Sequence, residues 1–343
     1  MILESNNKET SMNTKLKQVI ESMHNQKIDS MIVLKPENIR YLTGFRPSSS
    51  SILILKEDPI LLASKIDRED ASGSSMVNLE VYKKFDDVKK LLNGKVGIEK
   101  SMTVETYKKL SGEFEVETID IVEISRSIKS KWEVENIEKA LQIAEKSLME
   151  LEFAGTEVEL AAKLEYNMRI NGSERPSFET IMASGTRTSL PHGSPSLNKI
   201  ESPILIDWGV VYNNYSSDTT RTIIETEKQE EIFKIVLDAQ KTAIKSIKPG
   251  VKSSEIDTAA RDVITEYGYG DSFIHSTGHG VGLEIHETPS LSKNDEGILE
   301  KGMVVTVEPG IYLEGEFGVR IEDMILIKNH ATVLNKIKTK LSF

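Results

Sequence analysis

Two carboxylates interrupt stretches of the chain that otherwise have the character of buried strands. The apolar run Ile204–Trp208 contains Asp207, and after a turn region at residues 212–214 the chain returns with Asp218. If the two stretches pair as a hairpin, these carboxylates face each other across the strands. Burial of two neighbouring carboxylates is costly because like charges repel, and a divalent cation removes that conflict.

A second pair of acids follows nearer the C-terminal end. The run Met303–Glu308 ends in an acid just before Pro309, and a further strand is expected over Gly318–Ile327. Within that strand Arg320 and Glu322 are two residues apart, so they share a face. The four acids therefore all interrupt or end strands that the sequence marks as buried.

Histidines are concentrated between the two pairs of acids. The chain has six histidines, and the stretch H-S-T-G-H-G-V-G-L-E-I-H holds His275, His279 and His286. Its glycines permit a close approach of the backbone to a partner. Four carboxylates and one imidazole are hard ligands that suit Mn²⁺, Co²⁺, Fe²⁺ or Zn²⁺. Five protein ligands are too many for one open catalytic ion, but they suit two ions that share carboxylates.

Simpler interpretations compete with each residue taken alone. An acid at a strand end is usually a solvated turn residue, and an isolated histidine is more often packed or exposed than bound to metal. The glycine-rich stretch is not a nucleotide-binding loop, because it lacks the G-x-G-x-x-G spacing and a following Lys-Ser/Thr. The chain also has no G-x-S-x-G motif, which argues against a serine hydrolase. Only the order and spacing of the whole set favour a metal site.

Composition narrows the class of protein further. The net charge of −11 argues against a nucleic-acid partner, and no apolar run is long enough to cross a membrane. The absence of cysteine excludes disulfides and zinc–thiolate sites, and the first ten residues lack the apolar core of a signal peptide. We therefore expect a cytoplasmic protein.

A chain of 343 residues is expected to form two domains. Residues 1–12 are polar and unpatterned, and we expect them to be disordered. Residues 13–124 alternate strands with helices and predict an α/β domain, including the distinctive segment N-I-R-Y-L-T-G-F at 38–45. Residues 125–343 predict an α+β domain, with long helices near 132–152, 157–171, 230–247 and 253–267. The second of these helices opens with a capping box, Thr156-x-x-Glu159.

The second half resembles the pita-bread-fold metallopeptidases, a family that includes methionine aminopeptidase, aminopeptidase P and prolidase. The resemblance rests on Asp207 and Asp218 separated by ten residues, then G-H-G-V-G-L-E-x-H-E, E-P-G and G-V-R-I-E-D, and it extends from about Arg126 to Ile327. The first half is similar to the creatinase-type domain of the Xaa-Pro branch. The implied fold is an α/β N-terminal domain followed by an α+β pita-bread catalytic domain.

The resemblance also implies roles for individual residues. The metal ligands would be Asp207, Asp218, His279, Glu308 and Glu322, with Asp218 and Glu322 bridging two ions, most simply Mn²⁺ or Co²⁺, with Fe²⁺ or Zn²⁺ as alternatives. Glu308 would also move a proton, and Arg320 would orient an acid. The further histidines of the active site would be His192, His275 and His286, which would contact the substrate or the ligands.

The implied reaction is hydrolysis of the Xaa-Pro bond by a hydroxide held between the ions, and the implied assembly is a homodimer. The substrates would be Xaa-Pro dipeptides or short peptides, with dipeptidase preferred to aminopeptidase P. Some prolidases have an arginine after H-E-x-P to hold the dipeptide carboxylate. This chain has Ser290 there, so Lys293 or Arg187 would have to substitute. A metal-free creatinase is disfavoured by the five ligands, and a catalytically inactive binding protein of this fold is the alternative from another class.

Overall fold

The computed structural model describes residues 2–48 and 50–341. Contacts within the chain divide it into two units between Arg126 and Ser127, two residues beyond the expected boundary. Among the described residues, no helix combines the length and the apolar character needed to cross a bilayer.

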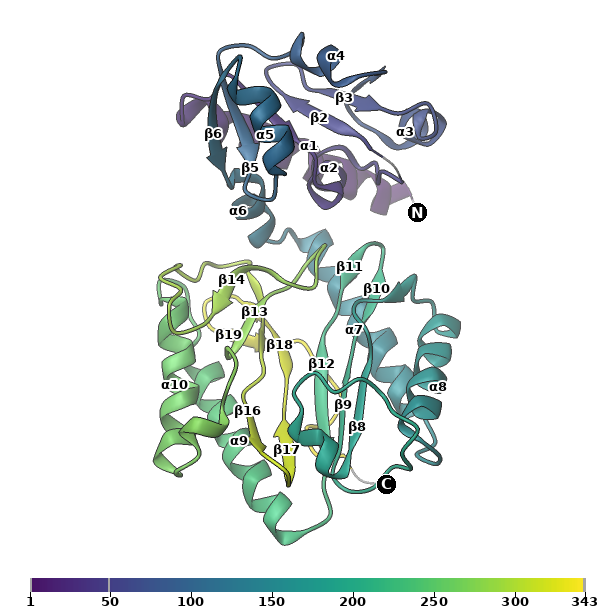
Figure 1. Cartoon of the computed structure of the whole chain (residues 1–343), viewed down its shortest axis with the longest axis vertical. Coiled ribbons are helices and arrows are strands. Elements are labelled where there is room, and N and C mark those ends of the chain that lie inside the picture. The colour runs from purple at the N-terminus through teal and green to yellow at the C-terminus, as the bar shows by residue number, and fades with distance from the viewer. Residues whose placement is uncertain (1, 49, 342–343) are drawn as a thin grey trace. The chain divides into compact units, whose positions relative to one another are not determined.

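The first unit is built on one mixed sheet, as the alternation of strands and helices predicts. Its strands are ordered β4-β3-β2-β1-β5-β6 (Figure 1), with β1–β2 and β2–β3 antiparallel and the other neighbours parallel. The strands are β1 (Ser30–Val33), β2 (Ile52–Leu55), β3 (Ile60–Ala63), β4 (Asn78–Val81), β5 (Lys95–Glu99) and β6 (Glu115–Ile119). The helices are α1 (Ile2–Asn25), α2 (Pro36–Thr43), α3 (Arg68–Ser74), α4 (Phe85–Lys89), α5 (Val104–Ser111) and α6 (Ile121–Ser127).

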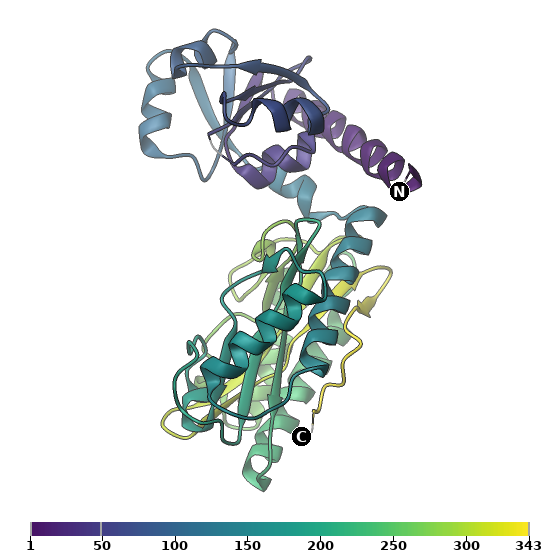
Figure 2. The same ribbon diagram turned by 90° about the vertical axis from the view of Figure 1, so that its right-hand side faces the viewer.

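The expected disorder of residues 1–12 is wrong for Ile2–Met12, because α1 begins at Ile2, and Met1 lies outside the described residues. The long helix is drawn in purple in Figure 2. Its buried positions Met12, Leu16, Val19 and Met23 follow helical spacing, so the apolar stripe starts within the segment that looked unpatterned. No proline or glycine in residues 2–12 interrupts the helix.

The segment N-I-R-Y-L-T-G-F forms α2 and its C-terminal cap. The buried Asn38 side chain donates to Glu99 Oε1 (2.6 Å) and Glu123 Oε1 (2.8 Å), and it accepts from Arg126 Nη1 (2.7 Å). Gly44 ends the helix with a φ of 81°, which favours glycine. The segment therefore ties α2 to β5 and α6, and its distinctive residues serve the fold of this unit.

The second unit consists of two halves, each with a pair of long helices packed on strands (Figure 1). In the first half, α7 (Lys131–Met149) and α8 (Glu157–Ile170) cover the core around Trp208, whose Nε1 donates to Ala144 O (2.9 Å). Its strands form two three-stranded sheets, β11-β10-β7 and β12-β9-β8. They are β7 (Arg175–Pro176), β8 (Ile181–Ser184), β9 (Ile204–Trp208), β10 (Val210–Tyr212), β11 (Tyr215–Ser216) and β12 (Thr219–Ile223).

In the second half, α9 (Glu227–Ser246) and α10 (Ser253–Glu266) pack on a five-stranded sheet, β14-β13-β15-β18-β19, and on the hairpin β16-β17. The strands are β13 (Gly278–Gly280), β14 (Glu287–Leu291), β15 (Val304–Val307), β16 (Gly310–Leu313), β17 (Phe317–Arg320), β18 (Asp323–Ile327) and β19 (Ala331–Val333). Two short 3₁₀ helices, η1 (Gly185–Ser189) and η2 (Gly270–Ser272), complete the unit.

The helices predicted for this unit are confirmed, and one predicted strand is corrected. The four long helices are present, and Thr156 and Glu159 form the predicted capping box of α8. The single strand predicted over residues 318–327 is wrong: β17 ends at Arg320 and β18 begins at Asp323. The two strands pair with different partners, β17 with β16 and β18 with β15, so the chain changes sheets at Glu322.

Candidate metal-dependent active site

The predicted ligand residues lie at the ends or edges of strands from both halves of the second unit. Asp207 is within β9, Asp218 directly precedes β12, His279 is within β13, Glu308 directly follows β15, and Glu322 lies between β17 and β18. Asp218 and Glu322 are buried, and the other three are partly buried. Strand pairing in each half therefore sets where these side chains lie.

The two aspartates are not directly opposite each other, which corrects the hairpin prediction. Asp207 is paired with Thr220, and Asp218 lies outside the paired residues of β12. The segment between the aspartates forms additional strands, because β10 pairs with β11 and β7 in a separate sheet. The hairpin thus exists, but a change of sheet in the middle shifts the register.

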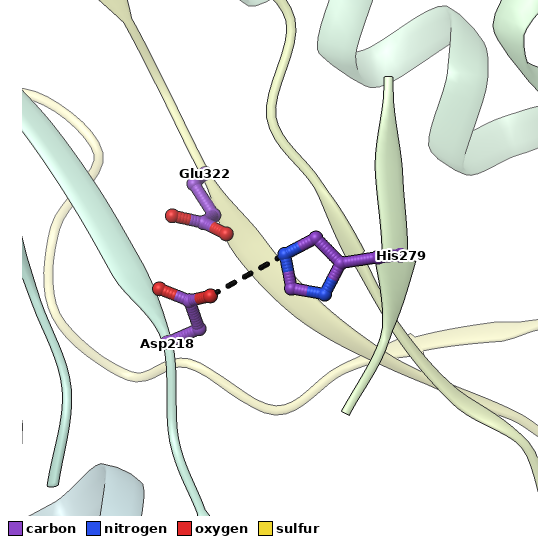
Figure 3. Close-up of side chains that lie close together, drawn as sticks. All are labelled: Asp218, His279 and Glu322. Atoms are coloured by element: carbon purple, nitrogen blue, oxygen red, sulfur yellow. Dashed lines mark ion pairs between the residues drawn. The ribbon is translucent and has the colours of Figure 1, made fainter. Parts of the chain in front are cut away.

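Asp218, His279 and Glu322 come together closely enough to share a cation. One potential ligand atom from each lies within 4.8 Å of the others. Figure 3 shows the two carboxylates and the imidazole directed toward one another from different segments of the chain. His279 Nε2 lies 3.5 Å from Asp218 Oδ2 and 3.3 Å from Glu308 Oε1. Four of the five predicted ligand residues are therefore linked by these proximities.

His279 is oriented by its other ring nitrogen. Its Nδ1 lies 3.0 Å from Gly280 O, a carbonyl that can only accept, so Nδ1 carries the proton in this hydrogen bond. In the neutral ring the lone pair of Nε2 is directed at the acids, and this is the arrangement in which imidazole binds metal.

The carboxylates of the cluster raise one another's proton affinity. Burial, followed by the charges of Glu322 and Asp207, raises the pKa of Asp218 well above its usual value. Burial and the charges of Glu308 and Asp207 do the same for the pKa of Glu322. Burial also opposes ionisation of Glu308, but the hydrogen bond and charge of His279 outweigh burial and lower its pKa to about 2. The raised pKa values of Asp218 and Glu322 are those of acids that lack sufficient positive charge among the side chains around them.

Two carboxylate oxygens in the cluster supply the test of fit for a cation. Asp207 Oδ1 and Glu322 Oε1 are buried, and neither has a hydrogen-bond partner. Buried polar atoms are nearly always paired, so two such oxygens near the imidazole of His279 call for a ligand. Hard oxygen donors and one imidazole fit a divalent cation.

Arg320 connects several parts of the site. Its Nη2 donates to Asp207 Oδ2 (2.6 Å), and its Nε donates to the hydroxyl of Thr220 (3.1 Å). That hydroxyl in turn donates to Glu322 Oε2 (2.8 Å). Arg320 thus binds Asp207 directly and Glu322 through Thr220.

His275 is engaged by both ring nitrogens. Nδ1 lies 2.7 Å from Ser276 O, and Nε2 lies 2.9 Å from the hydroxyl of Tyr312, which accepts from Arg320 Nη1 (2.8 Å). The carbonyl fixes the proton on Nδ1, so the tyrosine donates to Nε2. Burial lowers the pKa of His275 and favours this neutral form.

The other two predicted histidines are exposed. The ring of His286 meets that of His279 edge-on, with centroids 4.3 Å apart. His192 follows η1, and the carbonyl of its neighbour Pro191 accepts from Arg320 Nη1 (3.2 Å). Both therefore border the acid cluster, where a bound peptide could reach them.

Arg187, Lys293 and Ser290 are the residues considered above in connection with the carboxylate of a dipeptide substrate. Arg187 Nε donates to Glu157 Oε2 (3.1 Å), and its Nη2 donates to Ser194 O (2.6 Å). Lys293 is exposed in the loop after β14. Ser290 lies in β14 directly opposite His279 in β13.

Two residues that hold side chains of the site were missed by the sequence predictions: Thr220 and Tyr312. Each acts through partners far away in the chain; Thr220 and Glu322, for example, are 102 positions apart. No local spacing signals such contacts. The only hint for Thr220 was its place two residues after Asp218 in a strand already assigned to the site.

Comparisons with known proteins agree with this geometry. Residues 135–329 match the model of metallopeptidase family M24. The chain is also 45% identical to the Xaa-Pro dipeptidase of Pyrococcus horikoshii, over 96% of this chain and 99% of the relative. This chain belongs to metallopeptidase family M24. Residues 15–129 of this M24 metallopeptidase match the model of the creatinase/prolidase N-terminal domain.

Solved structures resemble this M24 metallopeptidase over nearly its full length. The crystal structure of the prolidase from Pyrococcus horikoshii OT3 has a TM-score of 0.91 at 42% identity and covers 96% of this chain and 100% of its own. That of the X-Pro aminopeptidase from Thermotoga maritima has a TM-score of 0.87 at 34% identity, with 95% and 98% covered. The predicted combination of creatinase-type and pita-bread domains is confirmed, and membership of M24 implies divalent metal ions.

Proposed function

We propose that this chain is a Xaa-Pro dipeptidase that uses two divalent cations. The observation that carries the proposal is the buried cluster of acids around His279, with two unpartnered carboxylate oxygens, in a chain 45% identical to a Xaa-Pro dipeptidase. The fold alone would not decide the substrate, because one fold can serve several reactions.

The proposed ligands of the cations are Asp207, Asp218, His279, Glu308 and Glu322. Support comes from the proximity of the ligand atoms of Asp218, His279 and Glu322, and from Glu308 Oε1 beside His279 Nε2. The raised pKa values of Asp218 and Glu322, which a bound cation would reverse, support it too. Mn²⁺ and Co²⁺ suit this oxygen-rich set best. When bound, such ions lower the pKa of water and polarise the scissile carbonyl.

Glu308 is proposed to move the proton during hydrolysis. At neutral pH its carboxylate is ionised, and this is the form that accepts a proton from attacking water. Thr306 donates to Glu308 Oε1 (3.2 Å) and holds the carboxylate beside His279. The proton would then pass to the proline nitrogen as that group leaves.

His286 and His192 are proposed to contact the substrate. Their exposure beside the cluster leaves them accessible to a bound peptide, and a histidine in such a place can stabilise the developing oxyanion. His275 is proposed to act differently, because both of its ring nitrogens are engaged. It positions Tyr312 and, through Tyr312, Arg320.

Aminopeptidase activity on longer Xaa-Pro peptides is the second candidate. Two observations favour it: Ser290, a neutral residue, stands directly across from His279, and Arg187 uses its Nε and Nη2 for contacts within the protein. The relative from Thermotoga maritima, an X-Pro aminopeptidase by name, shows how close the two branches lie. The homodimer and the cytoplasmic location remain predictions.

The deciding experiment is metal removal followed by separate addition of Mn²⁺, Co²⁺, Fe²⁺ or Zn²⁺. Each sample is assayed on a Xaa-Pro dipeptide and on a tripeptide with the same first two residues. We expect metal-dependent cleavage of the dipeptide, strongest with Mn²⁺ or Co²⁺. Cleavage of the tripeptide alone would show that the chain is an aminopeptidase and not a dipeptidase. Inactivity on both peptides with bound metal would refute both candidates.

A further inference from the structure

Glu157, the first residue of α8, is completely buried, and the predicted metal cluster does not use it. Its carboxylate instead gathers the segment that carries His192. We infer that Glu157 and Arg187 form a positioning pair that holds the His192 loop, defined as residues 184–196, at the active site. This inference rests on the proposed function, in which His192 contacts the substrate.

The contacts of Glu157 reach both ends of the His192 loop. Oε1 accepts from the backbone N–H (2.7 Å) and the hydroxyl (2.9 Å) of Ser184, and Oε2 accepts from the backbone N–H of Ser196 (2.9 Å). Arg187 Nε donates to the same Oε2 (3.1 Å), while its Nη2 donates to Ser194 O (2.6 Å). One carboxylate thus joins the beginning and the end of the loop, and the arginine adds a second cross-connection inside it.

Contacts from β17 fix the opposite side of the same loop. Gly318 N donates to the hydroxyl of Thr188 (2.9 Å), and a Cβ at Gly318 would come within 2.2 Å of Thr188 O. Arg320, which binds Asp207, also donates to Pro191 O. The loop is therefore held between α8 and the strand that carries Arg320, and exposed His192 lies near its tip.

Hydrogen bonds stabilise the ionised carboxylate of Glu157. Burial opposes ionisation, but the hydrogen bonds from Ser196 and Ser184 outweigh burial, and the pKa of Glu157 is lowered. A buried ion pair is an inefficient way to gain stability, since an apolar pair of similar volume often does as well. Unlike apolar packing, the pair forms directional hydrogen bonds to particular backbone groups. These bonds favour one conformation of the loop.

A matched pair exists in the other half of the unit. Asp257 of α10, equally buried, accepts from Arg261 Nε and Nη2 (both 2.9 Å) and from the backbone N–H of Thr277 (3.1 Å). Arg261 Nη2 also donates to His275 O (2.9 Å). This pair holds a different histidine segment, so it serves as a control of the same chemistry.

The test is a double-mutant cycle in the full-length, metal-loaded protein. Glu157→Gln, which keeps volume but removes the charge, should lower kcat/KM on a Xaa-Pro dipeptide by roughly tenfold to a hundredfold. Metal content should stay unchanged. In a His192→Ala background the same substitution should have almost no further effect, because the group that it positions is gone. Arg187→Met, a milder change that leaves the backbone bonds to Glu157, should show the same dependence on His192.

Asp257→Asn is the control. It should lower kcat/KM by the same factor in the wild-type background and in the His192→Ala background. The inference is overturned if Glu157→Gln leaves kcat/KM at the wild-type value, or if its cost is equal in both backgrounds, as for a purely structural residue. If His192→Ala alone has no effect, the loop role fails as well, while dipeptide cleavage by the wild type still supports the proposed function.

Discussion

Thr220 places one hydroxyl between the guanidinium of Arg320 and the carboxylate of Glu322. It accepts from Arg320 Nε and donates to Glu322 Oε2. Groups that orient a metal ligand in this way typically contribute a factor of about 10–100 to metal affinity. We therefore expect Thr220→Val, which preserves shape, to weaken the binding of Mn²⁺ by that factor in calorimetric titrations.

Thr222 provides the matched control in the same strand. Its buried hydroxyl donates to Arg320 O (2.8 Å) and accepts from Arg320 N (3.1 Å), with no contact to a carboxylate. Thr222→Val should cost about 2 kcal/mol of unfolding free energy, as the loss of its two hydrogen bonds implies, without a tenfold change in metal affinity. Equal weakening of Mn²⁺ binding by both substitutions would show that the hydroxyl of Thr220 has no special role.

At the scale of elements, the change of sheet at Gly209 sets where Asp218 lies. Gly209 joins β9 to β10, and a Cβ there would lie 1.9 Å from Ser217 O and 2.3 Å from Ser177 Oγ. The first of these atoms belongs to the backbone next to Asp218 and cannot move independently. Gly209→Ala should therefore both destabilise the fold, by about 3 kcal/mol or more, and weaken metal binding.

Denaturant unfolding and metal titration of Gly209→Ala check this expectation. Gly73→Ala is the control, because a Cβ at Gly73 meets nothing within 4 Å and the residue lies in α3. That substitution should be neutral or stabilising by up to about 1 kcal/mol. A Gly209→Ala protein with wild-type stability and metal affinity would contradict the close packing at this joint.

The elements also show how far the sequence could be interpreted. Apolar runs and capping signals identified the strands around Asp207 and Glu308 and the helix that begins after Thr156, because those patterns depend on neighbours in the chain. The register of Asp207 against Thr220 and the break at Glu322 depend on which strands pair, and pairing is decided by long-range packing. For the same reason Glu157 gave no sign of its role.

At the scale of the whole molecule, the buried acids of the metal site repel one another, and a bound cation would remove that repulsion. Without metal, the pKa values of Asp207, Asp218 and Glu322 are raised by burial and mutual repulsion, and that of His279 is raised because the hydrogen bond and charge of Glu308 outweigh its burial. At these four groups the folded metal-free protein then binds more protons than the unfolded chain above the usual carboxyl pKa. The contribution of these groups to stability therefore falls as the pH rises through that range.

Bound divalent cations reverse this dependence, since they require the ionised acids and the neutral imidazole. The increase in melting temperature that Mn²⁺ produces should be small at about pH 5 and larger at about pH 8, in scans of metal-free and metal-loaded protein. Asp218→Asn should reduce both the increase and its dependence on pH, because one repelling charge and one ligand are removed together. An increase that is the same at both pH values would mean that the cation binds away from these acids.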